Sequence, residues 1–333
     1  MKQHGRETHK RVAVVGCKHT TLELIVGLEQ RGFTVDHSIT ISPEQGAHHK
    51  VAGYLDLRPF LNEKAIPFTM AKQYSLNSQE DRDAILALHL DALLVMGWQR
   101  LIPAWLLDQL SIGAFGMHGS SKPLPHGRGR SPMNWSLVQN KDCFYTHLFR
   151  YRPGVDDGEI AAVQVFDITP FDTCLTLHYK NTLSMIGLLE KALPSLLDGT
   201  ARLTPQPTEG ATYYPKRADE DGLIYWSDPT LQIYNLVRAV TKPFPGAFTY
   251  LDNDPEKKVR IWRAIPFDTR LTWPNTLPGQ LVAVFGDGDF VVRAGDSSLL
   301  VQESEGAHFT HSDVGRQFGD LDTPRKVWPD LPE

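Results

Sequence analysis

Apolar runs alternate with amphipathic stretches over the first hundred residues of the chain. Residues 11–16 (RVAVVG) and 92–96 (ALLVM) are short and apolar, and a glycine ends or follows each run, which is typical of buried strands. Thr20 and Thr21 offer N-caps for an amphipathic helix that Gly32 ends. The alternation continues with a predicted strand over 33–41 and a predicted helix over 81–89. This order predicts an α/β fold with a parallel, doubly wound sheet.

The pattern changes after residue 200. Residues 173–197 predict one amphipathic helix, and the residues that follow, up to 222, are polar and rich in proline. A predicted helix over 231–240 is followed by short apolar runs at residues 247–251, 259–263, 279–285, 290–293 and 299–302. Closely spaced strands of this kind are typical of a small barrel or sandwich. We therefore expect a first domain over 1–203, a linker over 204–222 and a second domain over 223–333.

Composition and charge disfavour several classes of protein. The 333 residues carry a net charge of −5, which argues against a general nucleic-acid binder. The sequence has no apolar run as long as a membrane span requires, and residues 1–11 lack the apolar stretch of a secretory signal. Cys17, Cys143 and Cys174 show no metal-ligand spacing, and widely spaced thiols in odd number suit a reducing compartment. We expect a cytoplasmic protein without a metal site.

The residues that suggest chemistry lie between positions 115 and 160. A loop rich in glycine and proline follows the apolar run GAFGM, with His118 at its start and His126 further along. Residues 156–158 (DDG) form an acidic turn between two strand-like runs. Each histidine has a structural interpretation beside a functional one, and Asp156 is interpreted either as part of a tight turn or as a catalytic carboxylate. The first strand–helix junction, GCKHTT, lacks the GxGxxG pattern, which disfavours a dinucleotide site.

Several motifs in the same order resemble the folate-dependent formyltransferase family, whose pattern is roughly N-x-H-x-S-L-L-P, R-G-x-x-P, a threonine on a strand, and L-D-x-G. The corresponding residues here are His118-Gly119-Ser120, Pro125, residues 128–132 (RGRSP), Thr146 and residues 155–158 (VDDG). Residues 93–103 are similar to the family's folate-pocket strand and loop, and residues 213–226 and 236–250 to the linker and barrel of its longer members. The resemblance is nearly continuous from about residue 90 to 250. It implies a Rossmann-like domain with a parallel-rich sheet, followed by a small OB-like barrel.

The resemblance also implies a reaction. In this family an amine attacks the formyl carbon of 10-formyltetrahydrofolate, which requires a group that accepts the amine proton and a donor that stabilises the oxyanion. His118 takes the place of the catalytic histidine, Asp156 that of the catalytic aspartate, and Thr146 a nearby position on the supporting strand. A histidine titrates near neutrality, and a carboxylate beside it orients the ring and favours its charged form.

One position departs from the family pattern. The asparagine expected two residues before the histidine is Gly116 here, and glycine has no side-chain donor for an oxyanion. Asn134, Ser120 or a protonated His118 are the candidates to replace it. The loop between His118 and Arg128 is also about two residues longer than the family's pattern. These differences leave open an altered acceptor, slower chemistry or an inactive homologue.

The resemblance implies a folate pocket with two walls. The first wall is residues 94–102, among them Leu94, Val95, Met96, Arg100, Leu101 and Ile102. Arg100 would face the glutamate tail of the folate, whereas Leu94, Val95, Leu101 and Ile102 have an alternative interpretation as core residues. The second wall includes Arg152 and Val155. The co-substrate implied is 10-formyltetrahydrofolate, with no metal.

The charge of the C-terminal half and one motif bear on which molecule accepts the formyl group. Residues 205–333 contain 13 Lys and Arg against 19 Asp and Glu, a net charge of −6, which suits tRNA poorly. The stretch RGRSPMNW, which contains Asn134, resembles the enzyme that formylates UDP-4-amino-4-deoxy-L-arabinose more than methionyl-tRNA formyltransferase. The candidate acceptor-binding residues, including charges for a diphosphate, are Ser120, Arg128, Arg130, Lys216 and Arg217.

Three interpretations of the function follow. The first is N-formylation of a small-molecule amine on a nucleotide-linked amino sugar. The second is the same chemistry on methionyl-tRNA, an amino-acid derivative or a peptide-synthetase substrate. The third is a catalytically dead homologue that binds folate or a nucleotide sugar, which Gly116 allows. The exposed strands of the predicted barrel are compatible with a homodimer.

Overall fold

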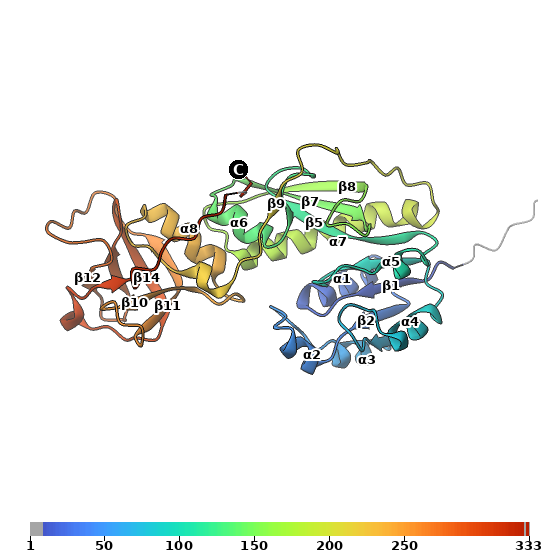
Figure 1. The fold of residues 1–333 in the computed structure, drawn as a ribbon, viewed down its shortest axis with the longest axis horizontal. Coiled ribbons are helices and arrows are strands. Elements are labelled where there is room, and N and C mark those ends of the chain that lie inside the picture. The colour runs from blue at the N-terminus through green and yellow to red at the C-terminus, as the bar shows by residue number, and fades with distance from the viewer. Residues whose placement is uncertain (1–8, 330, 333) are drawn as a thin grey trace, which may run out of the picture. The chain divides into compact units, whose positions relative to one another are not determined.

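The computed structural model describes residues 9–329, 331 and 332. These residues form two compact units (Figure 1). The first combines the chain up to Arg128 with Tyr145–Phe166 and Tyr179–Ala211, and the second combines Gly129–Phe144 and Asp167–His178 with the chain from residue 212 onward. Because each unit is assembled from several stretches, the expected domain boundaries at 203 and 222 stay a prediction.

A seven-stranded sheet in the order β3-β2-β1-β4-β5-β7-β8 is the centre of the first unit. The strands from β3 to β5 pair in parallel, and β5 pairs with β7 in antiparallel fashion. The seven strands are β1 Val12–Val15, β2 His37–Thr40, β3 Phe68–Met70, β4 Ala92–Val95, β5 Gly113–Ser120, β7 Cys143–Arg150 and β8 Ile160–Asp167. The expected α/β fold with a parallel-rich sheet is confirmed.

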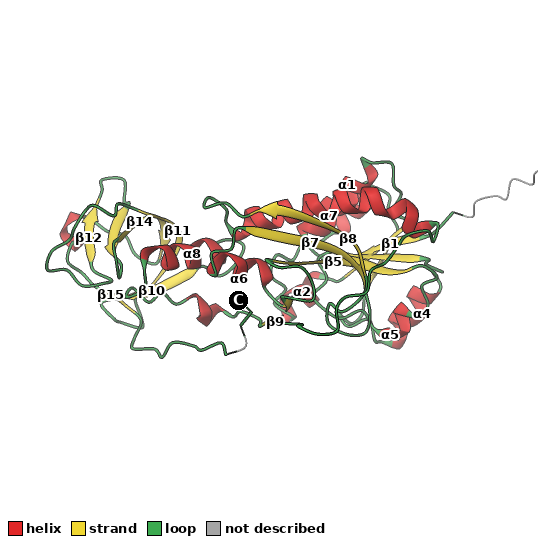
Figure 2. Ribbon diagram, turned by 90° about the horizontal axis from the view of Figure 1, so that it is seen from above, coloured by secondary structure: helices red, strands yellow, loops and turns green. Residues whose placement is uncertain are grey.

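Helices cover both faces of this sheet. The apolar residues of α1 and α7 pack on one face with Val12 and Val14, and those of α4 and α5 pack on the other with Ala13 and Val15 (Figure 2). Both faces of β1 are therefore buried, which explains its uninterrupted apolar run. The helices up to residue 197 are α1 His19–Glu29, α2 Pro43–His48, α3 Arg58–Glu63, α4 Gln79–Leu86, α5 Ala104–Leu107, α6 Pro132–Val138 and α7 Cys174–Leu197. Within the described ranges, none of the helices has the length and apolar character needed to cross a bilayer.

The predicted N-cap of the first helix is wrong. α1 begins at His19, and Lys18 is its N-cap. The Thr21 hydroxyl accepts a hydrogen bond from the Lys18 amide at 3.2 Å and donates one to the Met96 carbonyl at 2.6 Å. Thr21 therefore joins the start of α1 to the end of β4 instead of capping from outside. The predicted end is confirmed, since Gly32 follows the helix with a φ of +80°.

The C-terminal strands form a six-stranded antiparallel sheet in the order β12-β13-β14-β11-β10-β15. The sheet curls, so that its two edge strands, β12 and β15, come close together. Backbone hydrogen bonds join Leu281 of β12 to Gly315 and Arg316, which lie just before β15. The remaining elements are β6 Arg128–Gly129, β9 Tyr213–Tyr214, η1 Asp219–Gly222, α8 Thr230–Val240, β10 Ala247–Leu251, β11 Lys258–Pro266, β12 Leu281–Val284, β13 Phe290–Arg293, β14 Ser298–Glu305, η2 His311–Asp313 and β15 Phe318–Gly319. A small curled β-sheet after the α/β part confirms the expected fold class.

Candidate active site

His118 lies on β5, close to the end of the strand. Gly116, His118 and Ser120 share one face of the sheet because alternate residues of a strand point the same way. His118 is 7% exposed and Ser120 is buried. The predicted loop begins only after Ser120, so the strand, and not the loop, carries the histidine. A strand holds a side chain in a more defined orientation than a loop does.

Asp156 faces His118 from the turn between β7 and β8. Its Oδ2 atom lies 3.3 Å from Nδ1 of His118. Asp156 has a φ of +50°, a left-handed conformation that is uncommon outside glycine, asparagine and aspartate. Residue 156 is thus part of a tight turn and also faces the histidine, so the two interpretations of the sequence hold together. Local strain of this kind is typical of functional sites.

The imidazole of His118 contacts a carbonyl group on its other side. Its Nε2 lies 2.7 Å from the carbonyl oxygen of Gly127. A carbonyl only accepts hydrogen bonds, so Nε2 carries a hydrogen in this geometry. The other ring nitrogen, Nδ1, is the one that faces Asp156. Asp156 is the more exposed member of the pair, at 19% against 7% for His118.

Gln206 supports the turn that carries Asp156. Its side-chain nitrogen donates to the backbone oxygens of Asp156 and Gly158, at 2.8 and 2.7 Å. Its Oε1 accepts from Nη2 of Arg128 at 2.6 Å. Arg128, a candidate for diphosphate binding, is buried and engaged in this support. Nothing local in the sequence distinguishes Gln206 from the rest of a polar, proline-rich stretch.

His147 is a second histidine of the site that the sequence analysis did not identify. It is paired with His118 across the antiparallel strands β5 and β7. Its Nε2 accepts a hydrogen bond from the Leu124 amide at 3.2 Å, so Nδ1 carries the hydrogen of the neutral ring. Burial, followed by the charge of His118, lowers the pKa of His147 to about 4. His147 is therefore a neutral ring that holds the 121–128 loop beside the site.

Thr146, the expected neighbour of the catalytic pair, belongs to the opposite face of β7. Its hydroxyl donates to Oδ1 of Asn181 on α7 at 2.6 Å, and the side chain is fully buried. The placement gives Thr146 a part in packing β7 against α7. A direct part in the reaction stays a prediction.

The proposed folate walls differ in their side-chain exposure. The side chains of Leu94, Val95 and Ile102 are buried in the apolar core, as the alternative interpretation expected, and that of Met96 is buried as well. The core interpretation is wrong for Leu101, which is 54% exposed, and Val155 is 42% exposed. Two arginines of these walls have partners: Arg100 lies over the ring of Tyr74 at 5.1 Å, and Arg152 donates to Glu159 at 3.1 Å. A ligand here would contact backbone atoms of β4 and exposed side chains of the loops, and the walls stay a prediction.

The remaining candidates belong to the second unit. Asn134 is buried, and its amide donates to the Ala239 carbonyl at 2.6 Å, so it joins α6 to α8. The guanidinium of Arg217 stacks on Trp135 at 4.7 Å, and burial lowers the pKa of Arg217. Arg130 and Lys216 are exposed. Roles of these residues in the reaction or in acceptor binding stay predictions.

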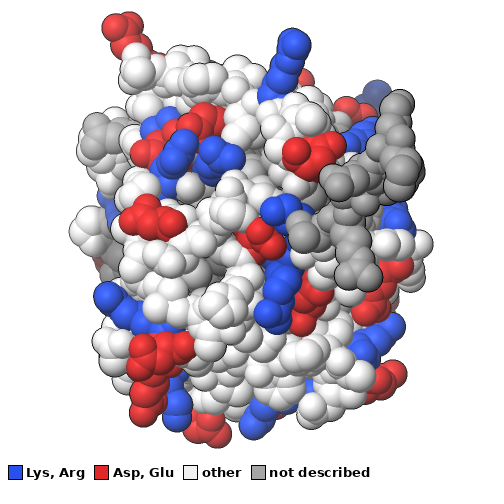
Figure 3. Space-filling model, turned by 90° about the vertical axis from the view of Figure 1, so that its right-hand side faces the viewer, with Lys and Arg blue, Asp and Glu red and all other residues white. Residues whose placement is uncertain are grey.

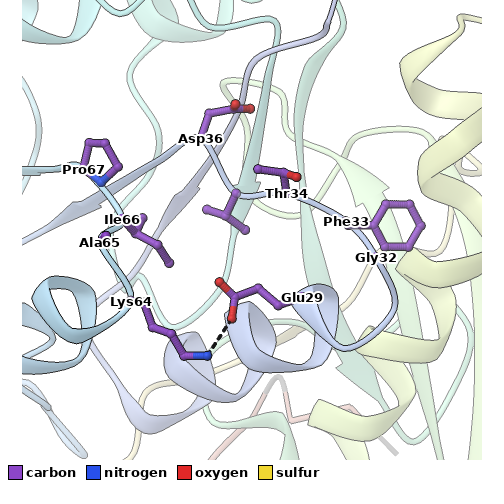
Figure 4. A pocket seen from close by; sticks show the side chains of 10 residues that line it. Glu29, Gly32, Phe33, Thr34, Asp36, Lys64, Ala65, Ile66 and Pro67 are labelled. Carbon is purple, nitrogen blue, oxygen red and sulfur yellow. Dashed lines mark ion pairs between the residues drawn. The ribbon is translucent and has the colours of Figure 1, made fainter.

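A separate hollow lies at the amino ends of β2 and β3 (Figure 4). Its volume is about 530 Å³, and its lining includes Glu29 and Lys64, which form an ion pair at 3.0 Å. Asp36 and Pro67 in the lining directly precede β2 and β3. Ligands of open α/β sheets bind at the carboxyl ends of the strands, so this hollow is not the candidate site. Across the part of the chain that the structure describes, no group of three or more His, Cys, Asp or Glu residues is placed to hold a metal.

Comparison with known proteins decides the family. The family model "Formyl transferase" matches residues 10–184, and the model "Formyl transferase, C-terminal domain" matches residues 216–311. The chain belongs to the formyl transferase family. His118 and Asp156 fall within the first matched range, and strands β10 to β14 of the curled sheet fall within the second.

Solved structures share the fold at low sequence identity. HypX from Aquifex aeolicus in complex with tetrahydrofolic acid has a TM-score of 0.64 and 18% identity, and the match covers 89% of this chain and 44% of that chain. The N-formyltransferase from Helicobacter canadensis in complex with folinic acid and dTDP-3-aminofucose has a TM-score of 0.61 and 14% identity, covering 88% and 99%. Methionyl-tRNA formyltransferase from Clostridium thermocellum has a TM-score of 0.54 and 14% identity, covering 77% and 93%. The chain spans less than half the length of the HypX chain that it matches.

Proposed function

We propose that this formyl transferase moves the formyl group of 10-formyltetrahydrofolate to the amine of a nucleotide-linked amino sugar. The observation that supports formyl transfer is the pairing of His118 and Asp156 at 3.3 Å, within the range of the matching family model. The order of events follows from this geometry and from the chemistry of amides.

The amine nitrogen attacks the formyl carbon, a C–N bond forms, and the carbonyl electron pair moves onto oxygen. Asp156, backed by Nδ1 of His118, takes the proton that the amine loses. The carbonyl then re-forms, the bond from the formyl carbon to N10 of the folate breaks, and N10 takes the proton. The Gly127 carbonyl keeps the imidazole in one orientation during both proton transfers, because it accepts the hydrogen of Nε2.

One residue of the first folate wall supports binding of a pterin. The indole Nε1 of Trp98, three residues after the end of β4, is buried and has no hydrogen-bond partner among the residues that the structure describes. A buried donor without an acceptor costs about 1–3 kcal/mol, so a ligand that supplies an acceptor oxygen gains at this point. The pterin ring carries such an oxygen. The residues present therefore fit a folate, and two of the similar structures hold tetrahydrofolic acid or folinic acid.

Charge favours a small acceptor over tRNA. The net charge of −6 over residues 205–333 is repulsive to a polyanion. On the face that Figure 3 presents, acidic and basic side chains are interspersed, without a continuous basic surface. The similar N-formyltransferase from Helicobacter canadensis was solved with dTDP-3-aminofucose, which supports a nucleotide-linked amino sugar.

The test is a mass-spectrometric assay with 10-formyltetrahydrofolate and a panel of nucleotide-linked amino sugars. We expect one panel member to gain a single formyl group. Asp156→Asn is expected to lower kcat by about a hundredfold to ten-thousandfold, since it removes the proton acceptor. Asp157→Asn, a matched change at the exposed neighbouring position, is expected to retain full activity. A panel that stays unformylated, or an Asp156→Asn variant with wild-type kcat, would contradict the proposal.

The match to methionyl-tRNA formyltransferase from Clostridium thermocellum supports a second candidate function, formyl transfer to an acceptor other than an amino sugar. The same assay extended to charged methionyl-tRNA, amino acids and peptide-synthetase substrates separates the two candidates. An inactive homologue would bind folate and formylate none of these acceptors.

A further inference from the structure

The place of the missing asparagine is filled by another side chain. Gly116 lies two residues before His118 on the same face of β5. A Cβ atom added to Gly116 would lie 2.5 Å from Cε2 of Tyr151 and 3.1 Å from its hydroxyl oxygen. The phenol ring of Tyr151 therefore occupies the space into which an asparagine side chain at position 116 would extend. Glycine at 116 is what allows this approach.

The backbone and a neighbouring ring hold Tyr151 in this place. Tyr151 directly follows β7, and its amide donates to the carbonyl of Ala114 at 2.8 Å. Its ring stacks on Phe149, with centroids 5.0 Å apart and an angle of 22° between the rings. These two contacts hold the ring and its hydroxyl in one orientation. A donor that is oriented in advance stabilises a developing negative charge more effectively than a mobile one.

The hydroxyl of Tyr151 is a donor without a protein acceptor. Within residues 9–329, 331 and 332 it makes no hydrogen bond. Burial, and then the negative charge of Asp156, raises the pKa of Tyr151. The phenol therefore keeps its proton at any pH at which the protein would act. It presents an O–H group on the side of β5 where His118 and Asp156 meet.

We propose that Tyr151 is a catalytic residue, whose hydroxyl donates a hydrogen bond to the oxyanion in place of the asparagine of the family pattern. This inference rests on the proposed formyl transfer and adds the donor that it lacks. When the amine attacks, the carbonyl electron pair moves onto the formyl oxygen, and the Tyr151 O–H stabilises that charge without giving up its proton. The amine proton still goes to Asp156 and His118. Gly116 then makes room for the Tyr151 donor, and its presence does not imply an inactive protein.

Tyr151→Phe is the decisive variant because it removes only the hydroxyl and keeps the ring that packs on Phe149. We expect kcat to fall about a hundredfold to a thousandfold, as for other oxyanion donors, and the dissociation constant for a formylfolate to stay within about threefold. Tyr179→Phe is the matched control, because Tyr179 is 60% exposed and belongs to α7, which contacts the other face of β7. It is expected to behave like the wild type.

A second measurement does not depend on the acceptor. The stable analogue 10-formyl-5,8-dideazafolate, labelled with ¹³C in the formyl group, is bound to each variant, and its carbonyl stretch is recorded by difference infrared spectroscopy. A hydrogen bond lowers this frequency in the wild type, and Tyr151→Phe is expected to restore the higher value. Replacing Tyr151 by 3-fluorotyrosine, which has a more acidic phenol, is expected to lower the frequency further.

The outcomes separate this inference from the proposed function. If the wild type binds the analogue and Tyr151→Phe keeps both its carbonyl frequency and its kcat, the role of Tyr151 is overturned while formyl transfer stands. If the frequency shifts as expected but no amino sugar is formylated, Tyr151 is supported and the acceptor is wrong. If the wild type does not bind the analogue, both proposals fall.

Discussion

At the residue scale, the site contains two histidines, His118 and His147, which are neighbours across the strand pair β5 and β7 and have different surroundings. His118 contacts the carboxylate of Asp156 on one side of its ring and the carbonyl of Gly127 on the other. His147, across the strand pair, accepts a hydrogen bond from the Leu124 amide and is kept neutral by burial. The site therefore has one ring that is paired with a carboxylate and one neutral ring that positions a loop.

His147→Gln tests this assignment through the pH dependence of stability. The folded-state pKa of about 4 lies below the ordinary value of about 6.5, so the unfolded chain binds the proton first. The contribution of the neutral His147 ring to the free energy of unfolding is fully present above about pH 6.5, and it is lost as the pH falls toward about 4. When the pH is lowered from 7 to 5, the free energy of unfolding measured in urea should fall by about 2 kcal/mol more in the wild type than in His147→Gln.

The control for this measurement is His48→Gln, because His48 is an exposed histidine on α2. We expect this variant to follow the pH dependence of the wild type. Equal pH slopes for the wild type and His147→Gln would show that His147 is not held neutral in the folded state.

At the scale of elements, the turn between β7 and β8 depends on a segment far along the chain. The Gln206 side chain bonds two backbone oxygens of the turn and the buried guanidinium of Arg128. The turn itself needs glycine at 158, since a Cβ there would lie 1.7 Å from the Arg150 carbonyl oxygen. A left-handed Asp156 within such a turn keeps its position only while these contacts persist.

Gln206→Ala should therefore affect both stability and rate. Loss of the bonds to a buried arginine and two carbonyls is expected to lower the free energy of unfolding by about 1–3 kcal/mol. A small displacement of Asp156 is expected to lower kcat by about tenfold to a hundredfold, with KM for the acceptor little changed. Gln164→Ala, the same change at an exposed position of β8, is the control. A stability loss with unchanged kcat would reduce Gln206 to a purely structural role.

At the scale of the whole molecule, charge bears on the acceptor. The net charge is −5 for the chain and −6 for residues 205–333, so the C-terminal part carries the acidic excess. Binding of tRNA relies on lysine and arginine that neutralise phosphates, and its strength falls steeply with salt. A nucleotide sugar presents only a diphosphate, which two or three basic side chains are enough to hold.

We expect the full chain to bind tRNA poorly. In a filter-binding assay at about 150 mM salt, the dissociation constant for initiator tRNA should exceed about 10 μM, the range of weak non-specific binding. Methionyl-tRNA formyltransferase from Clostridium thermocellum, measured alongside, provides the comparison. Tighter binding with a steep dependence on salt would favour the tRNA acceptor instead.

The sequence by itself determined the alternation of strands and helices, the turn at Asp156 and the candidate pair of His118 and Asp156. These features depend on local periodicity and on motifs of a few residues, which are visible without the fold. It also showed that Gly116 lacks the expected donor, but it did not show which side chain takes the place of that donor.

The tertiary structure decided which side chains meet. His147 and Tyr151 reach the site because β7 is paired with β5 in one register, and a shift of one residue would turn each of them to the other face. Gln206 reaches the turn from 50 residues away in sequence, and the core takes up the side chains of β4 that the folate-wall motif included. Such contacts depend on strand register and long-range packing, which no short pattern contains.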